Sequence, residues 1–171
     1  MSHPGEYFLN RAESKLSLRT ILLLADQILS LMEALHSNGI ILRVVDPRSL
    51  SIGTSPRGDV QFNMLTFNDL SLCKFYLNEK TKKHIEFRKR SVLFSSDIDM
   101  NFISLNALRY EELSRRDDIE SLGYFMLHFF KGDRITSDSV NDFILFKENI
   151  DNYCTKFEIP SKLMRDHHGF C

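Results

Sequence analysis

The stretch Ser114-Arg-Arg-Asp-Asp-Ile-Glu-Ser-Leu-Gly-Tyr124 joins a cluster of charges to the start of an apolar repeat. From Ile119 onward, apolar residues recur at spacings of three and four, as in an amphipathic helix. The repeat predicts a helix over 117–130, and Gly132 stands where a left-handed residue can end it. The charges at 114–118 have two interpretations: a solvated cluster that caps the helix, or buried carboxylates that need hydrogen-bond donors.

A longer apolar repeat lies upstream and predicts a second helix over Ser17–His36. Ser17 is a good N-cap residue, and Gly39 is a natural left-handed terminator. Additional leucines widen the apolar face until little polar surface remains. We therefore expect this helix to be central to the fold.

The region between the two helices predicts short strands. The run 40–45 is strand-like and ends at Asp46-Pro47, while 49–53 and 60–67 predict a hairpin around a turn at 55–58. No helical period is present over 78–101, which predicts a long loop. A weaker helix is predicted over 139–153 and a short one from Pro160 onward, so the expected fold class is mainly α.

Composition excludes several classes of protein. The 22 Lys+Arg and 23 Asp+Glu residues nearly cancel, so no global field indicates a nucleic-acid partner. The longest apolar run, at 21–25, is far shorter than the roughly 20 residues that a membrane span needs. Three scattered cysteines form neither a disulfide framework nor a C-x-x-C metal site. We expect a cytoplasmic or nuclear location, without a membrane or nucleic-acid partner.

Two stretches resemble the casein kinase I family of serine/threonine protein kinases. The stretch 114–124 is nearly that family's signature, and Leu35-His36-Ser37-Asn38-Gly39-Ile40-Ile41-Leu42-Arg43-Val44 is similar to the approach to its catalytic loop. Residues 69–76 resemble the segment that begins with the kinase D-F-G motif, and 84–88 resemble part of the activation loop. The likeness covers 8–160, in the family's order.

The resemblance implies a protein-kinase-like C-terminal lobe over 8–160, followed by a tail at 161–171. It assigns helix E to 17–36, the catalytic loop to 42–49, the activation segment to 69–106 and helix F to 118–130. Helices E and F would surround a small β-hairpin catalytic and activation region. Only 16 residues precede Ser17, and they contain no Gly-rich loop, so we expect the N-terminal β lobe to be absent.

The catalytic positions of the resemblance are degenerate. A kinase needs an Asp that accepts the substrate proton, a Lys near the phosphate and an Asn on magnesium. The matching residues here are Val44, Asp46 and Ser49, so no catalytic residue is intact. Asp69 matches the D of D-F-G and is a candidate magnesium ligand; its alternative role is to cap a turn after the hairpin.

The scaffold positions of the resemblance are retained. Asp118 matches the helix F aspartate that holds the catalytic-loop backbone in kinases, and Arg43 is expected near it. Glu112 is expected to pair with Arg115 or Arg116, as in the ion pair that tethers the end of the activation segment.

Three functions follow as alternatives. The preferred hypothesis is a truncated, inactive pseudokinase that binds a protein partner or another kinase lobe, without a cofactor. The alternative is an active kinase of this family, which would use ATP and Mg²⁺ to phosphorylate Ser or Thr. A third possibility, a decayed fragment, is disfavoured because the apolar faces of the predicted helices are intact.

Overall fold

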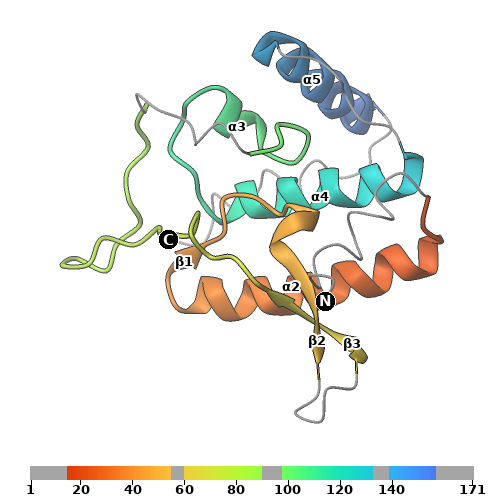
Figure 1. Cartoon of the computed structure of the whole chain (residues 1–171). Helices are drawn as coiled ribbons and strands as arrows, with labels where there is room; N and C mark the ends of the chain where they lie inside the picture. Colours follow the sequence, from red (N-terminus) through yellow and green to blue (C-terminus); the bar gives the residue numbers. More distant parts are fainter. Residues whose placement is uncertain (1–14, 55–59, 90–97, 133–138, 157–171) are drawn as a thin grey trace.

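The helices predicted over 17–36 and 117–130 are present and pack against each other (Figure 1). The computed structural model describes residues 15–54, 60–89, 98–132 and 139–156. Helix α2 (Leu18–Ser37) begins at Ser17, whose hydroxyl accepts a hydrogen bond from the Thr20 amide. Gly39 follows with φ +77°, as expected of a left-handed terminator.

Helix α4 (Arg115–Lys131) lies beside α2 and runs antiparallel to it. At one end of the pair, the Leu16 amide donates to the Phe129 carbonyl at 3.0 Å. At the other end, the His36 ring lies 2.7 Å from the Asp118 carboxylate. Gly132 ends α4 with φ +76°, which confirms the predicted stop.

The hydrophobic core lies between these two helices and the segment that follows α2. Residues of α2 that point into it recur at spacings of three and four, as the sequence predicted. Its members from α2 and α4 are Ile21, Ala25, Ile28, Met32, Leu122, Phe125 and Phe129.

Two small antiparallel sheets accompany the helices. Strand β1 (Ile40–Ile41) pairs with β4 (Lys74–Phe75), and β2 (Leu50–Thr54) pairs with β3 (Val60–Phe67) after the short 3₁₀ helix η1 (Pro47–Ser49). The predicted hairpin is therefore confirmed, while its turn at 55–58 lies outside the described residues.

The predicted strand at 40–45 is shorter than expected. The structure has only two strand residues there, and Val44 adds an isolated bridge to Ile103. The physical reason is that the next two amides donate to the Asp118 carboxylate instead of to a neighbouring strand. Arg43 also has φ +76°, which turns the chain out of the strand direction.

Two further helices complete the described chain. Helix α5 (Val140–Lys156) confirms the weaker prediction, whereas α3 (Leu105–Leu108) was not predicted because four residues carry too little periodicity. The predicted helix from Pro160 lies outside the described residues. The loop prediction over 78–101 holds where that segment is described, apart from isolated bridges such as Leu77 with His84.

The fold is thus a set of helices with two small antiparallel sheets. None of the helices in the described ranges has the length and apolar character needed to cross a bilayer.

Candidate functional site

The segment 42–49 is anchored at its start by the carboxylate of Asp118. The Leu42 amide donates to Asp118 Oδ2 at 2.8 Å, and the Arg43 amide donates to Oδ1 at 2.7 Å. Asp118 has no exposed surface, so these bonds replace the water that its charge would otherwise need. The prediction that Asp118 holds this backbone is confirmed. The contribution of His36, which lies 2.7 Å from the same carboxylate, was missed.

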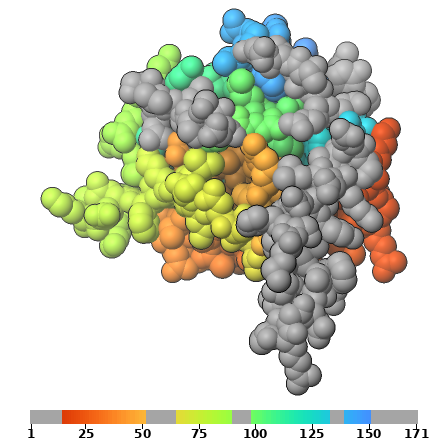
Figure 2. All heavy atoms as spheres, viewed as in Figure 1, coloured from red at the N-terminus to blue at the C-terminus, as the bar shows by residue number. Residues whose placement is uncertain are grey.

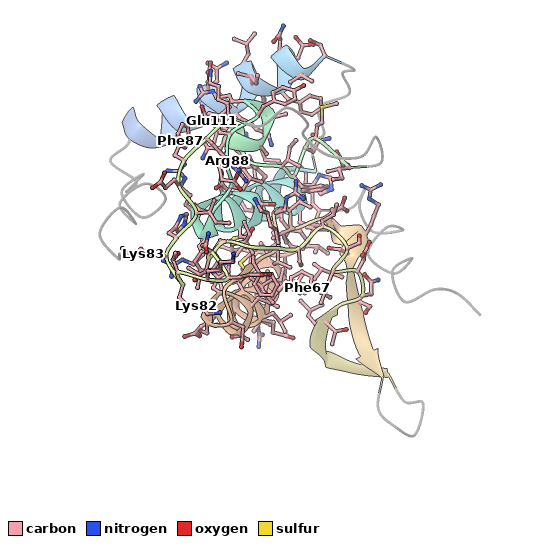
Figure 3. All side chains as sticks on the ribbon, turned by 90° about the vertical axis from the view of Figure 1, so that its left-hand side faces the viewer. Phe67, Lys82, Lys83, Phe87, Arg88 and Glu111 are labelled. Atoms are coloured by element: carbon pink, nitrogen blue, oxygen red, sulfur yellow. The ribbon has the colours of Figure 1, made fainter. Side chains whose placement is uncertain are left out.

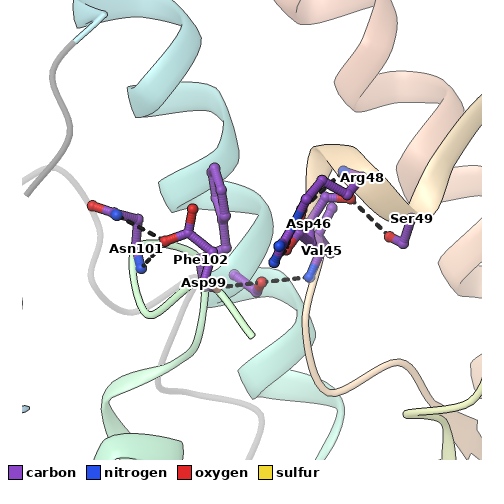
Figure 4. A network of polar contacts seen from close by, with 8 residues as sticks. Val45, Asp46, Arg48, Ser49, Asp99, Asn101 and Phe102 are labelled. Carbon is purple, nitrogen blue, oxygen red and sulfur yellow. Dashed lines mark hydrogen bonds and ion pairs between the residues drawn. The ribbon is translucent and has the colours of Figure 1, made fainter. Parts of the chain in front are cut away.

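A second bridge from α4 fixes the middle of the segment (Figure 4). The Val45 amide donates to the Ser121 hydroxyl at 2.7 Å, and that hydroxyl donates to the Phe102 carbonyl at 2.6 Å. Val44 is 5% exposed and pairs with Ile103. The position that the resemblance gives to a proton acceptor therefore holds a buried aliphatic side chain.

Asp46 and Ser49 make their contacts within the segment itself. The single N–H of Arg48 Nε donates to both oxygens of the Asp46 carboxylate at 3.0 Å, and Arg48 Nη2 lies 2.5 Å from Oδ2 (Figure 4). The carboxylate also accepts the Arg48 amide, which caps η1. The Ser49 hydroxyl donates to the Asp46 carbonyl at 2.7 Å. The local guanidinium thus offsets the negative charge of Asp46.

These side chains line a pocket of about 360 Å³. Figure 2 shows this face of the molecule, where the orange 42–50 segment lies beside the yellow 65–75 segment. The lining residues are Leu42, Val44, Asp46, Arg48, Ser49, Asp69, Ser71, Leu72, Cys73 and Ile98. Burial raises the pKa of the Cys73 thiol to about 11, so this group is not a ready nucleophile at neutral pH.

Asp69 is the pocket residue that the sequence proposed as a magnesium ligand. Its carboxylate accepts the Ser71 amide at 2.8 Å, and this bond lowers the pKa of Asp69 below its ordinary value. The turn-capping role is therefore present. Across the described ranges, no three His, Cys, Asp or Glu side chains gather closely enough to hold a metal ion.

The predicted partner of Glu112 was wrong. Its carboxylate, 4% exposed, contacts Lys74 Nζ and accepts Arg88 Nε at 2.9 Å. Arg115 lies instead over the Tyr76 ring, 5.2 Å from its centroid, and Arg116 Nε lies 3.8 Å from Asp117.

Glu112 nonetheless connects segments that are distant in the sequence, which is the kind of contact that was expected of it. Its amide donates to the Arg88 carbonyl at 2.9 Å, next to the bridge between Lys89 and Glu111. Figure 3 shows Phe87 and Arg88 on the strip of chain that runs beside Glu111. Two cations from 74–88 therefore replace the expected arginine of the SRRDD stretch. Sequence spacing favoured near neighbours, whereas the fold brought more distant ones closer.

Asp117 forms a second buried polar cluster that was not predicted. Its carboxylate accepts hydrogen bonds from Ser104 Oγ and Asn106 Nδ2 at 2.9 Å and from the Ser114 amide at 2.7 Å. Burial raises the pKa of Asp117, and the same hydrogen bonds oppose the rise. The spacing Ser114-x-x-Asp117 before an apolar run is a helix-start signal, and it could have indicated the hydrogen bond from the Ser114 amide to Asp117. Both aspartates being buried excludes the solvated-cluster interpretation of 114–118.

Lys147 on α5 is the second unforeseen buried charge. It is 1% exposed, its ammonium donates to the Ile103 carbonyl, and it lies 3.9 Å from the centre of the Tyr124 ring. Burial lowers its pKa to about 7, although the charges of Glu120 and Asp99 oppose the shift. No sequence signal marks it, because lysines are seldom buried.

No protein-family model matches this chain.

Proposed function

We propose that this chain is a casein-kinase-I-like C-terminal lobe that has no phosphotransferase activity and acts as a protein-binding module. The observation that carries the proposal is Val44, a buried aliphatic side chain where the resemblance requires a proton acceptor. Phosphoryl transfer depends on positioned charges rather than on covalent chemistry by the protein. A pocket that lacks those charges offers a binding surface.

The other pocket residues support the absence of catalysis. Asp46 stands where a kinase has a lysine, and its carboxylate is already paired with Arg48. A phosphate placed nearby would meet a neutralised ion pair instead of a free cation. The Ser49 hydroxyl, at the position of a magnesium-binding asparagine, donates to the Asp46 carbonyl. Losing one preorganised stabilising group of this kind costs about 2.7–4 kcal/mol of transition-state stabilisation.

The scaffold around the pocket supports a stable binding domain. The hydrogen bonds from Leu42 and Arg43 to Asp118, and from Val45 to Ser121, hold the segment 42–45 against α4. Such bonds between distant segments stabilise a fold whether or not the pocket is catalytic.

The exposed apolar side chains of helices α2 and α4 support the proposal that the chain binds a protein partner. Large apolar side chains are exposed along α2 and α4, which is typical of interaction sites when such residues are contiguous. The most exposed of them on these two helices are Leu18, Leu22, Leu23, Leu29 and Phe130.

A thermal melt of the purified chain, with and without millimolar Mg-ATP, tests whether the folded chain binds the nucleotide that a kinase would need. A ligand that binds only the folded state stabilises it by about 2.7 kcal/mol at 100 times its dissociation constant. We expect a cooperative melt whose midpoint Mg-ATP leaves unchanged.

A magnesium-dependent rise in the midpoint would contradict the proposal. It would instead favour the active-kinase alternative, in which Asp69 holds magnesium. The matched control is Asp69→Ala, which removes the candidate ligand at an exposed position. If the rise is present in the wild type and absent in this variant, phosphotransfer assays with a Ser/Thr peptide should follow.

A further inference from the structure

One side of the α2–α4 pair carries a row of apolar side chains on each helix. On α2, Leu18, Leu22 and Leu29 are 56%, 52% and 43% exposed. Their spacings of four and seven place them on one line along the helix. This line flanks the buried stripe of α2 and belongs to a different part of its surface.

Helix α4 carries a matching line on the same side. Ile119, Met126 and Phe130 have the same spacings in reverse order, and Phe130 is 55% exposed. Leu29 and Ile119 line one groove of about 520 Å³, which shows that the two lines share a side. Because the helices are antiparallel, the Leu18 end of α2 lies beside the Phe130 end of α4.

The two walls of this groove carry opposite charges. Glu33 of α2 and Arg115 of α4 both line it at the same end. Glu33 is exposed and has no ion pair within the described part of the chain. Arg115 lies over the Tyr76 ring, and no carboxylate contacts it in the described ranges.

We propose that this face is the interface of a twofold-symmetric homodimer, in which a second copy of the chain covers the α2–α4 groove. The proposal rests on the proposed function as a protein-binding module and names its partner. A twofold axis parallel to the helices places α2 of one copy over α4 of the other. The apolar lines then meet each other, and each Glu33 faces an Arg115 of the second copy.

Self-complementarity is the reason for choosing a second copy over an unrelated partner. A twofold interface needs a surface that matches itself after the rotation. Here each wall supplies an apolar line, and the charge at its end is opposite to that of the facing wall. An unrelated partner would require no such match between α2 and α4.

The size of the face indicates a reversible dimer. At 1.5 Å per residue, the 20 residues of α2 and 17 of α4 are about 30 Å and 25 Å long. Two helices of about 10 Å width then offer roughly 500 Å² per copy, which is near the lower limit of specific interfaces. We therefore expect dissociation in the micromolar range.

Sedimentation velocity of the full chain across micromolar concentrations tests the proposal. The wild type should shift from monomer to dimer as concentration rises. Leu22→Glu should raise the dimer dissociation constant by at least about tenfold, because it places a charge in the apolar contact. The control is Leu145→Glu, which changes a leucine of similar exposure on α5 and should leave the constant unchanged.

A charge-exchange experiment tests the symmetry itself. In Glu33→Arg or Arg115→Glu alone, like charges face each other across the interface, so each variant should be monomeric at concentrations where the wild type dimerises. Mixing the two variants should restore a dimer, since one copy then offers two arginines and the other two glutamates. Circular dichroism melts of each variant show whether the fold is retained.

Three results would overturn the dimer. They are a wild type that stays monomeric throughout, a dimer that Leu22→Glu leaves intact, and folded charge variants that fail to pair when mixed. None of these results changes the response of the melt to Mg-ATP. Failure of the dimer is therefore distinguishable from failure of the proposed function.

Discussion

Two pairs of aspartates in this molecule differ in how far along the chain their hydrogen-bond partners lie. Asp117 and Asp118, at the start of α4, are fully buried, and their partners include residues from the distant segments 36–43 and 104–106. Asp46 and Asp69, at the pocket, have side-chain bonds to residues only two positions away. The first pair joins the fold together, whereas the second pair closes local turns. Removing each carboxylate should therefore have effects of very different size.

The largest effect is expected for Asp118→Ala. The substitution leaves the buried amide of Leu42 and the amide of Arg43 without their acceptor and removes the partner of His36. Removing one partner from a buried polar cluster of this kind lowers the free energy of unfolding by about 3–5 kcal/mol. Urea unfolding followed by circular dichroism measures the loss. Asp118→Asn keeps one acceptor oxygen, so it should cost less. A change within experimental error for the alanine variant would contradict the anchoring role.

This contrast also shows what the sequence could predict. The helices α2 and α4 followed from apolar periodicity, and the role of Asp118 followed from the resemblance of the stretch around it. The partners of Asp117 could not be predicted, because Ser104 and Asn106 lie in a segment without periodicity. The shortness of β1 could not be predicted either, since it depends on a carboxylate more than 70 residues away. Long-range hydrogen bonds leave little local pattern.

In the pocket, too, the sequence predicted the chemistry of single residues but not their contacts. The valine side chain of Val44 cannot accept a proton, and this was evident from the sequence alone. That Arg48 closes on Asp46, two positions away, needed the geometry of η1. The pairing of Glu112 was predicted with the wrong arginines because several cations lay within reach in sequence, and only the fold selected Lys74 and Arg88.

A pH series on Lys147→Met sharpens the comparison with a buried charge of the opposite sign. Burial lowers the pKa of Lys147 from 10.5 to about 7. Between these values, the unfolded chain holds a proton that the folded chain has released. Stability should therefore rise with pH across this window, by up to about 1.4 kcal/mol per unit. Below about pH 7 this contribution should be constant.

Methionine removes the titrating group at similar length. The variant should be more stable than the wild type near pH 6 and lose that advantage toward pH 10. Urea unfolding at several pH values measures the difference. The control is Lys131→Met at an exposed position of α4, which should show no such trend. Parallel pH profiles for wild type and Lys147→Met would show that Lys147 is charged and solvated when the chain is folded.

A small effect is expected for Arg48→Ala. The Arg48 side chain is 44% exposed whereas that of Asp46 is 9% exposed, so the ion pair should contribute about 1 kcal/mol, the upper end of the range for exposed pairs. The Asp46 carboxylate keeps the bond from the amide at position 48, so η1 should persist. The melt should show a shift several times smaller than that of Asp118→Ala. An equal loss would place Asp46 among the residues that hold the fold together.

The smallest effect is expected for Asp69→Ala. The carboxylate is exposed and its bond to the Ser71 amide closes one turn, so the melting midpoint should not change measurably. The informative measurement is the same melt with millimolar Mg²⁺ added. If Asp69 only caps the turn, wild type and variant respond to Mg²⁺ identically. A magnesium-dependent stabilisation that disappears in the variant would make the pocket a cation site and remove the difference between Asp69 and a catalytic ligand. Identical responses would mean that Asp69 holds no magnesium, which agrees with a pocket whose acidic residues Asp46 and Asp69 bond to neighbours two positions away.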